Sequence, residues 1–344
     1  YYISKGLKER GFKTFGKIVA IIFAIFCIGG SFGGGNAAQS NQATVVLKEL
    51  MGLESSGAGF WIGVVMAVVV GVIIIGGIKR IASVTEKVVP FMAVLYLLAC
   101  LYILGANFSL IDDAFSLIFR EAFNPTAIGV GGVIGVLLVG FKRAAFSNEA
   151  GAGSASIAHS AVKTKYSASE GLVALLEPFI DTVVICTMTA LVIIIFNFGG
   201  DASGATIFQY GGDGAGAVLI DGVSYEGAGI TSKAFAEYIP YSNVFLTVAV
   251  VLFAVSTMIS WSYYGLQSWK FLFGRGKAAD MAYKLLFLLF VIIGASASMN
   301  SIWAFSDAMI FAMVFPNMVG LYFLFPVVKK QLKRYTDAIK ESHA

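Results

Sequence analysis

The sequence predicts an all-α polytopic membrane protein, a single transmembrane domain over residues 1–344 with eight membrane spans. Composition is the first indication, because 58% of residues are hydrophobic and 13% charged, against about 45–50% and about 25% in soluble domains. The second is a set of apolar runs close to the ~20 residues that cross a bilayer. The third is the distribution of basic residues between the loops. Together they indicate lipid as the surrounding solvent.

Eight apolar runs define the predicted spans. Each is expected to be helical, because the bilayer interior offers no partner for free backbone N–H and C=O groups. The runs are Ile18–Gln39, Phe60–Ile78, Val88–Asn107, Pro125–Phe141, Leu172–Phe198, Val244–Ser268, Met281–Met299 and Ile302–Val327.

The basic residues fix the predicted orientation. Eight spans place both ends of the chain on one side, and that side holds all but three of the 24 Lys and Arg residues. The exceptions are Lys48, Arg120 and Lys233. Cytoplasmic loops collect Lys and Arg, so both termini and the loop 142–167 are predicted to be cytoplasmic and the loop 199–243 extracellular. A bacterial inner (plasma) membrane is the expected location.

Several functional classes are excluded by what the sequence lacks. No basic patch is interleaved with aromatics in a polar region, so nucleic acid is not an expected partner. The three cysteines lie in apolar runs and two histidines complete no metal-ligand spacing, so neither a disulfide framework nor a bound cofactor is expected. Ser147 and His159 lack a third catalytic partner. The protein is therefore predicted not to be an enzyme.

Two outer loops carry their own expectations. Segment Ser109–Asn124 is acidic and partly apolar, which predicts an amphipathic helix on the membrane surface. The loop 199–243 is long and rich in Gly. Loops of this length are commonly functional or disordered, so its Phe235–Tyr241 end is interpreted either as a cap over an outer vestibule or as part of a solvated connector.

Glycine runs mark two spans. Gly129, Gly131, Gly132 and Gly135 weaken the fourth span, since each interior Gly costs about 1 kcal/mol of helix stability relative to Ala. A broken helix that binds substrate and close helix packing are both compatible with this run. The run Gly29–Gly35 of the first span favours packing. Two amides follow it, Asn36 and Gln39, which could bind a polar solute or lie at the headgroup level.

The sixth span carries hydroxyl groups at helical spacing. Thr257, Trp261 and Tyr264 share one face, and Ser256, Ser260 and Tyr263 share the adjacent face. Hydroxyl oxygens suit a hard cation such as Na⁺. Bonding of Ser and Thr back to their own helix carbonyls is the alternative.

Three carboxylates lie within predicted spans. Glu177 and Asp181 are four residues apart, on one helix face, and Pro178 between them is expected to kink the helix. Asp307 lies in the last span. Carboxylates inside a membrane are candidates for coupling or for structural ion pairs, and for Asp181 a structural role is favoured.

The segment Phe146–Ala155, FSNEAGAGSA, closely resembles the signature of the alanine/glycine:cation symporters, also called the sodium:alanine symporter family. From composition alone this polar segment suggests a gate or a packing element. The resemblance continues through Glu177–Thr182, Cys186–Leu191, Phe253–Thr257, Trp261, Tyr263–Gly265 and Pro316–Asn317, and the opening Tyr1–Ile3 matches the end of a family motif.

The resemblance implies a leucine-transporter-type bundle of two inverted five-helix repeats. The eight spans would be core helices three to ten, with the N-terminal helices missing from this chain. It also implies that Ser256 and Thr257 bind Na⁺ and that Thr257 and Trp261 face the substrate. Gly131, Gly132 and Gly135 would lie in the broken sixth core helix, and Asn36 and Gln39 would reach the solute. The sequence departs from the family pattern at Ser260, where Gly is usual, and within Gly33–Asn41.

The resulting prediction is a Na⁺-coupled symporter that imports small neutral amino acids, alanine or glycine, by alternating access. Its partners would be the amino acid, Na⁺ and the lipid bilayer, with Na⁺ as the coupling ion and no other cofactor. One alternative is an H⁺-coupled transporter that uses Glu177 or Asp181 as a proton relay. Another is a non-transporting membrane sensor on the same fold.

Overall fold

A computed structural model describes residues 1–55, 57–123, 140–144, 146–149, 151–199, 206–210 and 217–343. Within these ranges seven helices are long and apolar enough to cross a membrane. They are Lys13–Met51, Ala58–Ile75, Gly77–Ala106, Ser167–Asn197, Ser242–Phe273, Lys277–Ser296 and Met299–Glu341. Most of the predicted fourth span, Pro125–Phe141, lies outside the described residues, so the count of eight stays a prediction.

The first spanning helix is continuous but changes its winding in the middle. It consists of α2 (Lys13–Phe32), a π-helical segment η1 (Gly33–Ala37) and α3 (Ala38–Met51). The short helix α1 (Tyr2–Glu9) precedes it and packs against α2. π-helical segments within α-helices are frequent at functional sites.

The next two helices differ from the hydropathy prediction in one respect. α4 (Ala58–Ile75) agrees with the predicted second span, whereas α5 (Gly77–Ala106) starts well before the predicted Val88. The expected loop between them is therefore wrong, because Lys79–Lys87 continues the helix as polar turns. Most of those residue types are good helix formers, and only the apolar part of the helix registers in hydropathy. Beyond α5 come η2 (Phe108–Leu110) and α6 (Ile111–Ala122), which confirms a helix in segment Ser109–Asn124.

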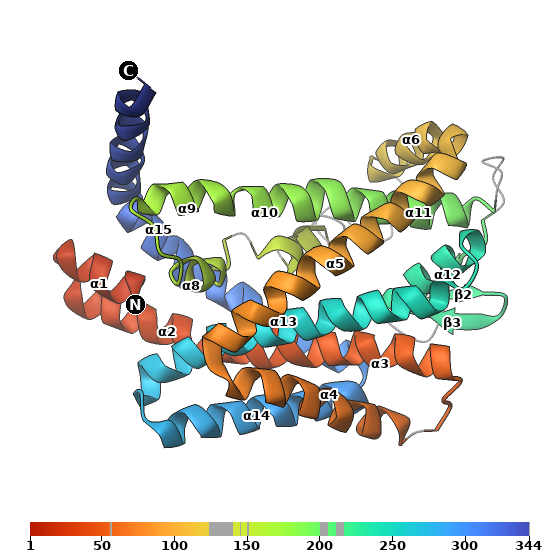
Figure 1. Ribbon diagram of the computed structural model, residues 1–344, viewed down its shortest axis with the longest axis horizontal. Coiled ribbons are helices and arrows are strands. Elements are labelled where there is room, and N and C mark those ends of the chain that lie inside the picture. The colour runs from red at the N-terminus through yellow and green to blue at the C-terminus, as the bar shows by residue number, and fades with distance from the viewer. Residues whose placement is uncertain are drawn as a thin grey trace.

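The segment predicted as the cytoplasmic loop 142–167 is folded against the bundle. It contains α8 (Ala155–His159) and leads into α9 (Ser167–Ala174), α10 (Leu176–Pro178), the π-helical η3 (Phe179–Cys186) and α11 (Thr187–Asn197). The winding changes directly after Pro178, where a kink was expected. Figure 1 shows α9, α10 and α11 following one another along one side of the molecule.

The loop 199–243, which is predicted to be extracellular, is partly structured. A small antiparallel sheet has the strand order β1-β2-β3, formed by Gln209–Tyr210, Val218–Ile220 and Val223–Tyr225. The helix α12 (Ala228–Tyr238) follows and packs against α13. Phe235 is fully buried and stacks on Tyr96 of α5 at a centroid distance of 5.5 Å. This end of the loop is therefore packed on the bundle, and the interpretation as a solvated connector does not hold for α12.

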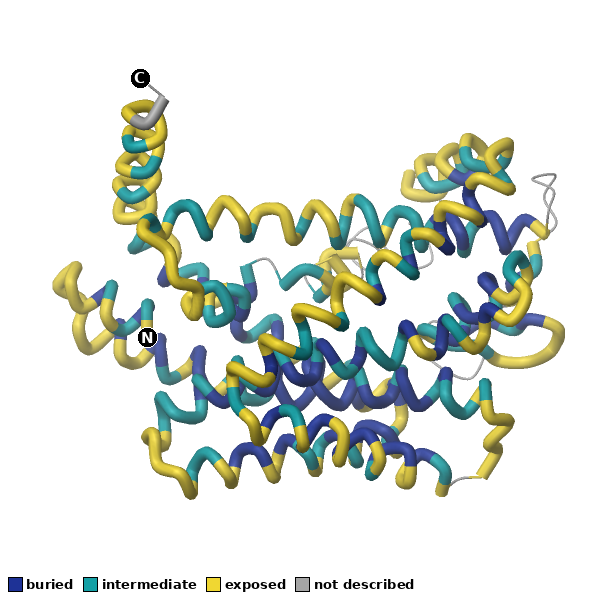
Figure 2. Tube along the Cα trace, viewed as in Figure 1, coloured by how far each residue is buried: buried dark blue, intermediate teal, exposed yellow. Residues whose placement is uncertain are grey.

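Three long helices complete the bundle: α13 (Ser242–Phe273), α14 (Lys277–Ser296) and α15 (Met299–His343). α13 packs against α2, α3, α5 and α14 and so lies at the centre, while α4 packs against α14. Burial follows this arrangement in Figure 2, where many residues of α2, α3 and α13 are buried, whereas α9, α10 and η3 are exposed or half-buried and the end of α11 is buried. Exposed apolar residues on outer helices suit contact with lipid.

Small residues allow the central helices to approach closely. A Cβ atom at Gly294 of α14 would lie 2.4 Å from the Cα atom of Ala37, and one at Gly59 of α4 would lie 2.5 Å from the carbonyl oxygen of Ala295. Such contacts are typical of helix packing in membranes. Because lipid removes the hydrophobic driving force between helices, their association depends on van der Waals contacts between closely spaced backbones. The core of the bundle is thus held by backbone proximity on both faces of α14.

Candidate functional site

A cavity of about 420 Å³ lies beside α13 in the middle of the bundle. Its walls come from α13, the first spanning helix, α5, α10, α15 and the segment that holds Phe146, Ser147 and Glu149. The lining residues are Gly34, Gln39, Thr85, Val89, Met92, Phe146, Ser147, Glu149, Glu177, Phe253, Ser256, Thr257, Ser260, Trp261, Tyr264 and Ile310.

The hydroxyl face of α13 lines this cavity. The Ser256 hydroxyl donates to the carbonyl of Phe253 at 2.8 Å, and that of Ser260 donates to the carbonyl of Ser256 at 2.9 Å. The back-bonding considered as an alternative is therefore present. It uses only the hydroxyl hydrogens, so the oxygen lone pairs remain available as acceptors. Thr257 also lines the cavity, next to both.

Trp261 forms the wall between α13 and η1. A Cβ atom at Gly35 would lie 2.2 Å from Trp261, and one at Gly34 would lie 2.8 Å from Phe146. Only glycine fits at these two positions, which supports the packing interpretation of the first glycine run. The Gln39 side chain donates to the Gly34 carbonyl at 3.1 Å and borders the same cavity.

Asn36 lies elsewhere. Its amide nitrogen donates to the carbonyl of Phe287 in α14 at 2.6 Å, and its buried Oδ1 has no hydrogen-bond partner among the described residues. Asn36 therefore does not line the cavity, because the π-turn directs its side chain to α14. Gly131, Gly132 and Gly135 lie outside the described residues.

Glu149 reaches the cavity from the folded 146–154 segment. Its Oε1 accepts a hydrogen bond from the Trp261 indole Nε1 at 2.6 Å, and its Oε2 accepts one from the Ser154 hydroxyl. Burial raises the pKa of the Glu149 carboxyl to about 7, although the hydrogen bonds from Ser154 and Trp261 act in the opposite direction. A carboxylate that can change its charge near neutral pH thus touches the aromatic wall.

The segment that carries Glu149 is fastened to two helices. Asn317 of α15 donates to the Gly151 carbonyl at 2.7 Å and accepts from the Tyr2 hydroxyl. Gly153 has φ +94°, and a Cβ atom there would lie 2.8 Å from both Asn317 and Phe23. This glycine is needed for its backbone conformation and for the close approach.

The two predicted coupling carboxylates take different positions. Glu177 lines the cavity, and its Oε2 lies 3.7 Å from Nε2 of His159. His159 Nδ1 lies 2.7 Å from Glu170. Asp181 accepts a hydrogen bond from Ser147 at 2.5 Å. This bond is compatible with a structural role, and the part of Asp181 in coupling stays a prediction.

A sequence model of the sodium:alanine symporter family matches residues 1–344. The chain belongs to the sodium:alanine symporter family. Over 341 residues it is 36% identical to the sodium/alanine symporter AgcS of Methanococcus maripaludis. The aligned region makes up 99% of this chain and 69% of that protein. It is 32% identical over 286 residues to the sodium/proton-dependent alanine carrier protein of Bacillus sp. strain PS3, and this aligned region makes up 81% of this chain and 62% of that protein. It shares 28% identity with the probable sodium/glutamine symporter GlnT of Bacillus subtilis, over 98% of this chain and 64% of that protein.

Membership confirms the resemblance found in the sequence and makes this protein a multi-pass membrane transporter rather than an enzyme. Of the residues predicted for the site, Gln39, Glu177, Ser256, Thr257 and Trp261 line one cavity of this symporter.

Sequence reasoning missed Glu149 as a cavity residue of the symporter. The available signal is the FSNEAGAGSA segment, in which the carboxylate follows Ser147 and Asn148 and precedes a run of Ala and Gly residues. The segment carries the family resemblance, but its sequence does not predict the contact with Trp261, which is 112 residues away.

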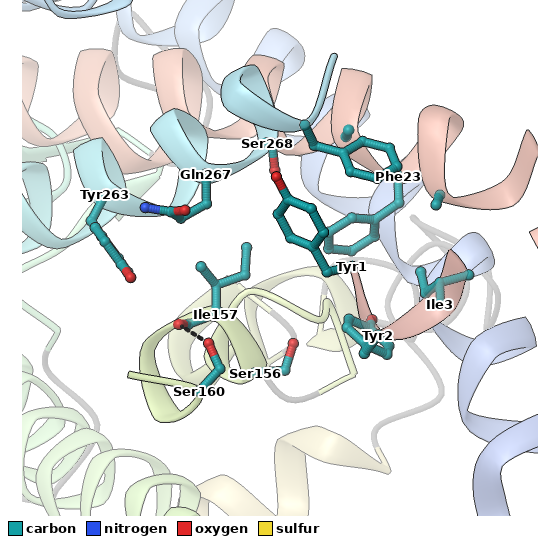
Figure 3. Close-up of a pocket in the computed structure, with 13 residues that line it drawn as sticks. Tyr1, Tyr2, Ile3, Phe23, Ser156, Ile157, Ser160, Tyr263, Gln267 and Ser268 are labelled. Atoms are coloured by element: carbon teal, nitrogen blue, oxygen red, sulfur yellow. Dashed lines mark hydrogen bonds between the residues drawn. The ribbon is translucent and has the colours of Figure 1, made fainter. Parts of the chain in front are cut away.

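A second cavity of about 200 Å³ lies among α1, α2, α8 and α13. Figure 3 shows Tyr263 and Gln267 of α13 on one side of it, and Ile157 of α8 and Ser160, which directly follows α8, on the other. Tyr263, which shares a predicted face with Ser256, therefore borders a different space from the hydroxyl pair.

Proposed function

We propose that this symporter couples the import of a small neutral amino acid, alanine or glycine, to Na⁺ by alternating access. The cavity beside α13 supports the proposal, because hydroxyl oxygens, an amide and an indole there converge on a space suited to a small polar solute. The names of two relatives, a sodium/alanine symporter and a sodium/proton-dependent alanine carrier, agree with this choice of ion and solute.

Na⁺ is assigned to the hydroxyl oxygens of Ser256 and Thr257, which are hard ligands of the kind such a cation prefers. The solute is assigned to the space between Gln39, Thr257 and Trp261. Asn36 is not retained in this set, since its amide bonds to α14. Gly131, Gly132 and Gly135 remain predicted contributors through the free backbone groups of a broken helix.

The fold proposed for this cycle is the leucine-transporter-type bundle of inverted repeats, with both ends of the chain in the cytoplasm. Two observations support it: the one-sided distribution of Lys and Arg, and a central helix, α13, that is surrounded by α2, α3, α5 and α14. In this scheme the segment 146–154 lies on the cytoplasmic side of the cavity and acts as the inner gate.

Uptake of radiolabelled alanine and glycine into proteoliposomes tests the proposal. An inward Na⁺ gradient with a negative interior should drive accumulation, since one charge is worth about 2.3 kcal/mol per 100 mV. Accumulation should vanish when both the gradient and the potential are removed. Accumulation that persists under these conditions would exclude Na⁺ coupling.

Proton coupling is the second candidate, and carboxylates at the cavity favour it. Glu149 and Glu177 both line the space, and the pKa of Glu149 is raised to about 7 by burial. Replacing Na⁺ by K⁺ at constant pH separates the two candidates, because a proton-coupled carrier would keep its full uptake rate.

A further inference from the structure

Glu149 is a non-glycine residue with a positive backbone φ angle. Its φ is +55°, in the left-handed region, and Gly151 and Gly153 close by have φ of +85° and +94°. Non-glycine residues seldom adopt this conformation. In this turn the carboxylate lies between Ser154 of its own segment and α13, where it accepts a hydrogen bond from the Trp261 indole.

The carboxylate has spare capacity for a ligand. Each of its two oxygens accepts one hydrogen bond, from Trp261 and from Ser154. An ionised carboxylate offers about four lone-pair sites. Two sites therefore have no partner among the residues that the structure describes, and Glu149 lines the cavity.

No basic side chain of the described residues forms an ion pair with this carboxylate. Among the described lining residues there is no Lys, Arg or His, and within the described chain Glu149 forms no ion pair. Opposite it stand acceptor groups, the hydroxyl oxygens of Ser256 and Ser260. A cavity of about 420 Å³ with acceptors on two sides attracts a ligand that brings positive charge.

We propose that Glu149 is the anionic ligand for the monovalent cationic group that occupies this cavity, either Na⁺ or the ammonium group of the amino acid. This inference rests on the proposed function. The free lone pairs bind the cation while the Trp261 hydrogen bond holds the carboxylate in place. Because Glu149 belongs to the segment fastened by Asn317, occupancy of the cavity also strengthens the docking of that segment on α13.

The other titratable groups that face Glu149 also leave its negative charge without a positive partner. They are Glu177 of α10, Asp181 of η3, Tyr264 of α13 and Cys27 of α2. The two carboxylates repel the Glu149 charge, and none of the four supplies a positive charge. A cation in the cavity relieves this repulsion.

Trp261 allows binding to be measured without transport. The chain has four tryptophans, and changing Trp61, Trp269 and Trp303 to Phe leaves the indole that contacts Glu149. The full chain in detergent is titrated with NaCl or KCl, then with alanine in KCl, and with lactate in KCl as a solute that lacks the ammonium group. Trp261 fluorescence reports occupancy.

The decisive variant is Glu149→Gln, and Glu170→Gln is its control because Glu170 pairs with His159 outside the cavity. Glu149→Gln should lose at least tenfold in affinity for one ligand, and Glu170→Gln should stay within twofold of the parent. A loss of affinity for Na⁺ alone identifies Na⁺ as the group that Glu149 binds. A loss of affinity for alanine in KCl identifies the ammonium group. Unchanged affinity for both would overturn the proposal.

Two further measurements keep the outcome clear. If Glu149→Gln does not purify as a monodisperse protein, Glu149→Asp retracts the carboxylate by one methylene and should weaken binding at least threefold, with no change counting against the proposal. Uptake separates this inference from the proposed function. Parent protein that binds through Glu149 but shows no Na⁺-driven uptake refutes the transport scheme alone, whereas Glu149→Gln with unaltered coupled uptake refutes the role of Glu149 alone.

Discussion

Arg143 and Asp307 form an ion pair that ties the segment before Glu149 to α15. The Arg143 Nη2 lies 2.6 Å from both carboxylate oxygens of Asp307, and its guanidinium lies over the Trp303 ring at 4.4 Å. Asp307 is one of the carboxylates predicted within a span, and this pair gives it a structural partner. The Asp307 side chain is 15% exposed, so its charge depends on that partner.

Removal of the Asp307 charge should therefore destabilise the protein. We expect Asp307→Asn to cost on the order of 2 kcal/mol, below the value for fully buried pairs because Arg143 is 42% exposed. Thermal unfolding in detergent measures this. Arg120→Gln is the matched control, since the Arg120–Glu121 pair is open to solvent at 71% and 46% and should contribute almost nothing. Equal melting temperatures for the two variants would contradict the assignment.

Gly35→Ala should abolish coupled uptake. The new Cβ atom would lie 2.2 Å from Trp261, and the indole must move away from the cavity wall and from Glu149. We expect at least a tenfold loss of alanine uptake rate at equal expression. Gly105→Ala, in α5, is the control because nothing lies within 4 Å of its Cβ position, and it should keep normal uptake. Full activity of Gly35→Ala would show that Trp261 is not needed where it stands.

Thr257→Ala should weaken the response to Na⁺. Loss of one hydroxyl oxygen from the proposed cation site is expected to raise the half-saturating Na⁺ concentration about tenfold, the effect of a lost ligand worth roughly 1–2 kcal/mol. Thr257→Ser should restore it. Ser262→Ala, on the same helix but bonded to the Ile259 carbonyl outside the cavity, should have no effect. A Na⁺ dependence that is the same in Thr257→Ala and the parent would remove Thr257 from the cation site.

The raised pKa of Glu149 predicts a pH-dependent stability. Between its ordinary value of 4.5 and about 7 the folded protein binds more protons at this site than the unfolded chain. Folding stability contributed by this group therefore falls as pH rises through that window and is constant above it. Raising the pH from about 5 to about 8 should lower the stability of the parent relative to Glu149→Gln by on the order of 2 kcal/mol.

Melting temperatures of the parent and Glu149→Gln across this pH range, in detergent without Na⁺, provide the measurement. Glu9→Gln, at an exposed position on α1, serves as control and should track the parent. Parallel curves for the parent and Glu149→Gln would show that the carboxyl does not titrate within this window.

Hydropathy located the spanning helices that the structure describes because a long apolar run in lipid must be helical. It could not place the start of α5, where Lys79–Lys87 extends the helix with polar turns. It also could not distinguish the π-helical winding of Gly33–Ala37 from a plain helix. The contact between Glu149 and Trp261 was beyond reach for another reason, since nothing local to either residue encodes a bond across the bundle.

The bond from Gln39 to the Gly34 carbonyl sets the chemical polarity of the cavity wall. In the π-turn this carbonyl receives the side-chain amide nitrogen of Gln39. One of the two amide hydrogens is thereby committed within its own helix, while the second hydrogen and the side-chain oxygen remain to meet an incoming molecule. A wall that offers a donor and an acceptor side by side matches a solute that carries N–H groups and a carboxylate on neighbouring atoms, and it offers less to a solute of the same size that carries only one of the two.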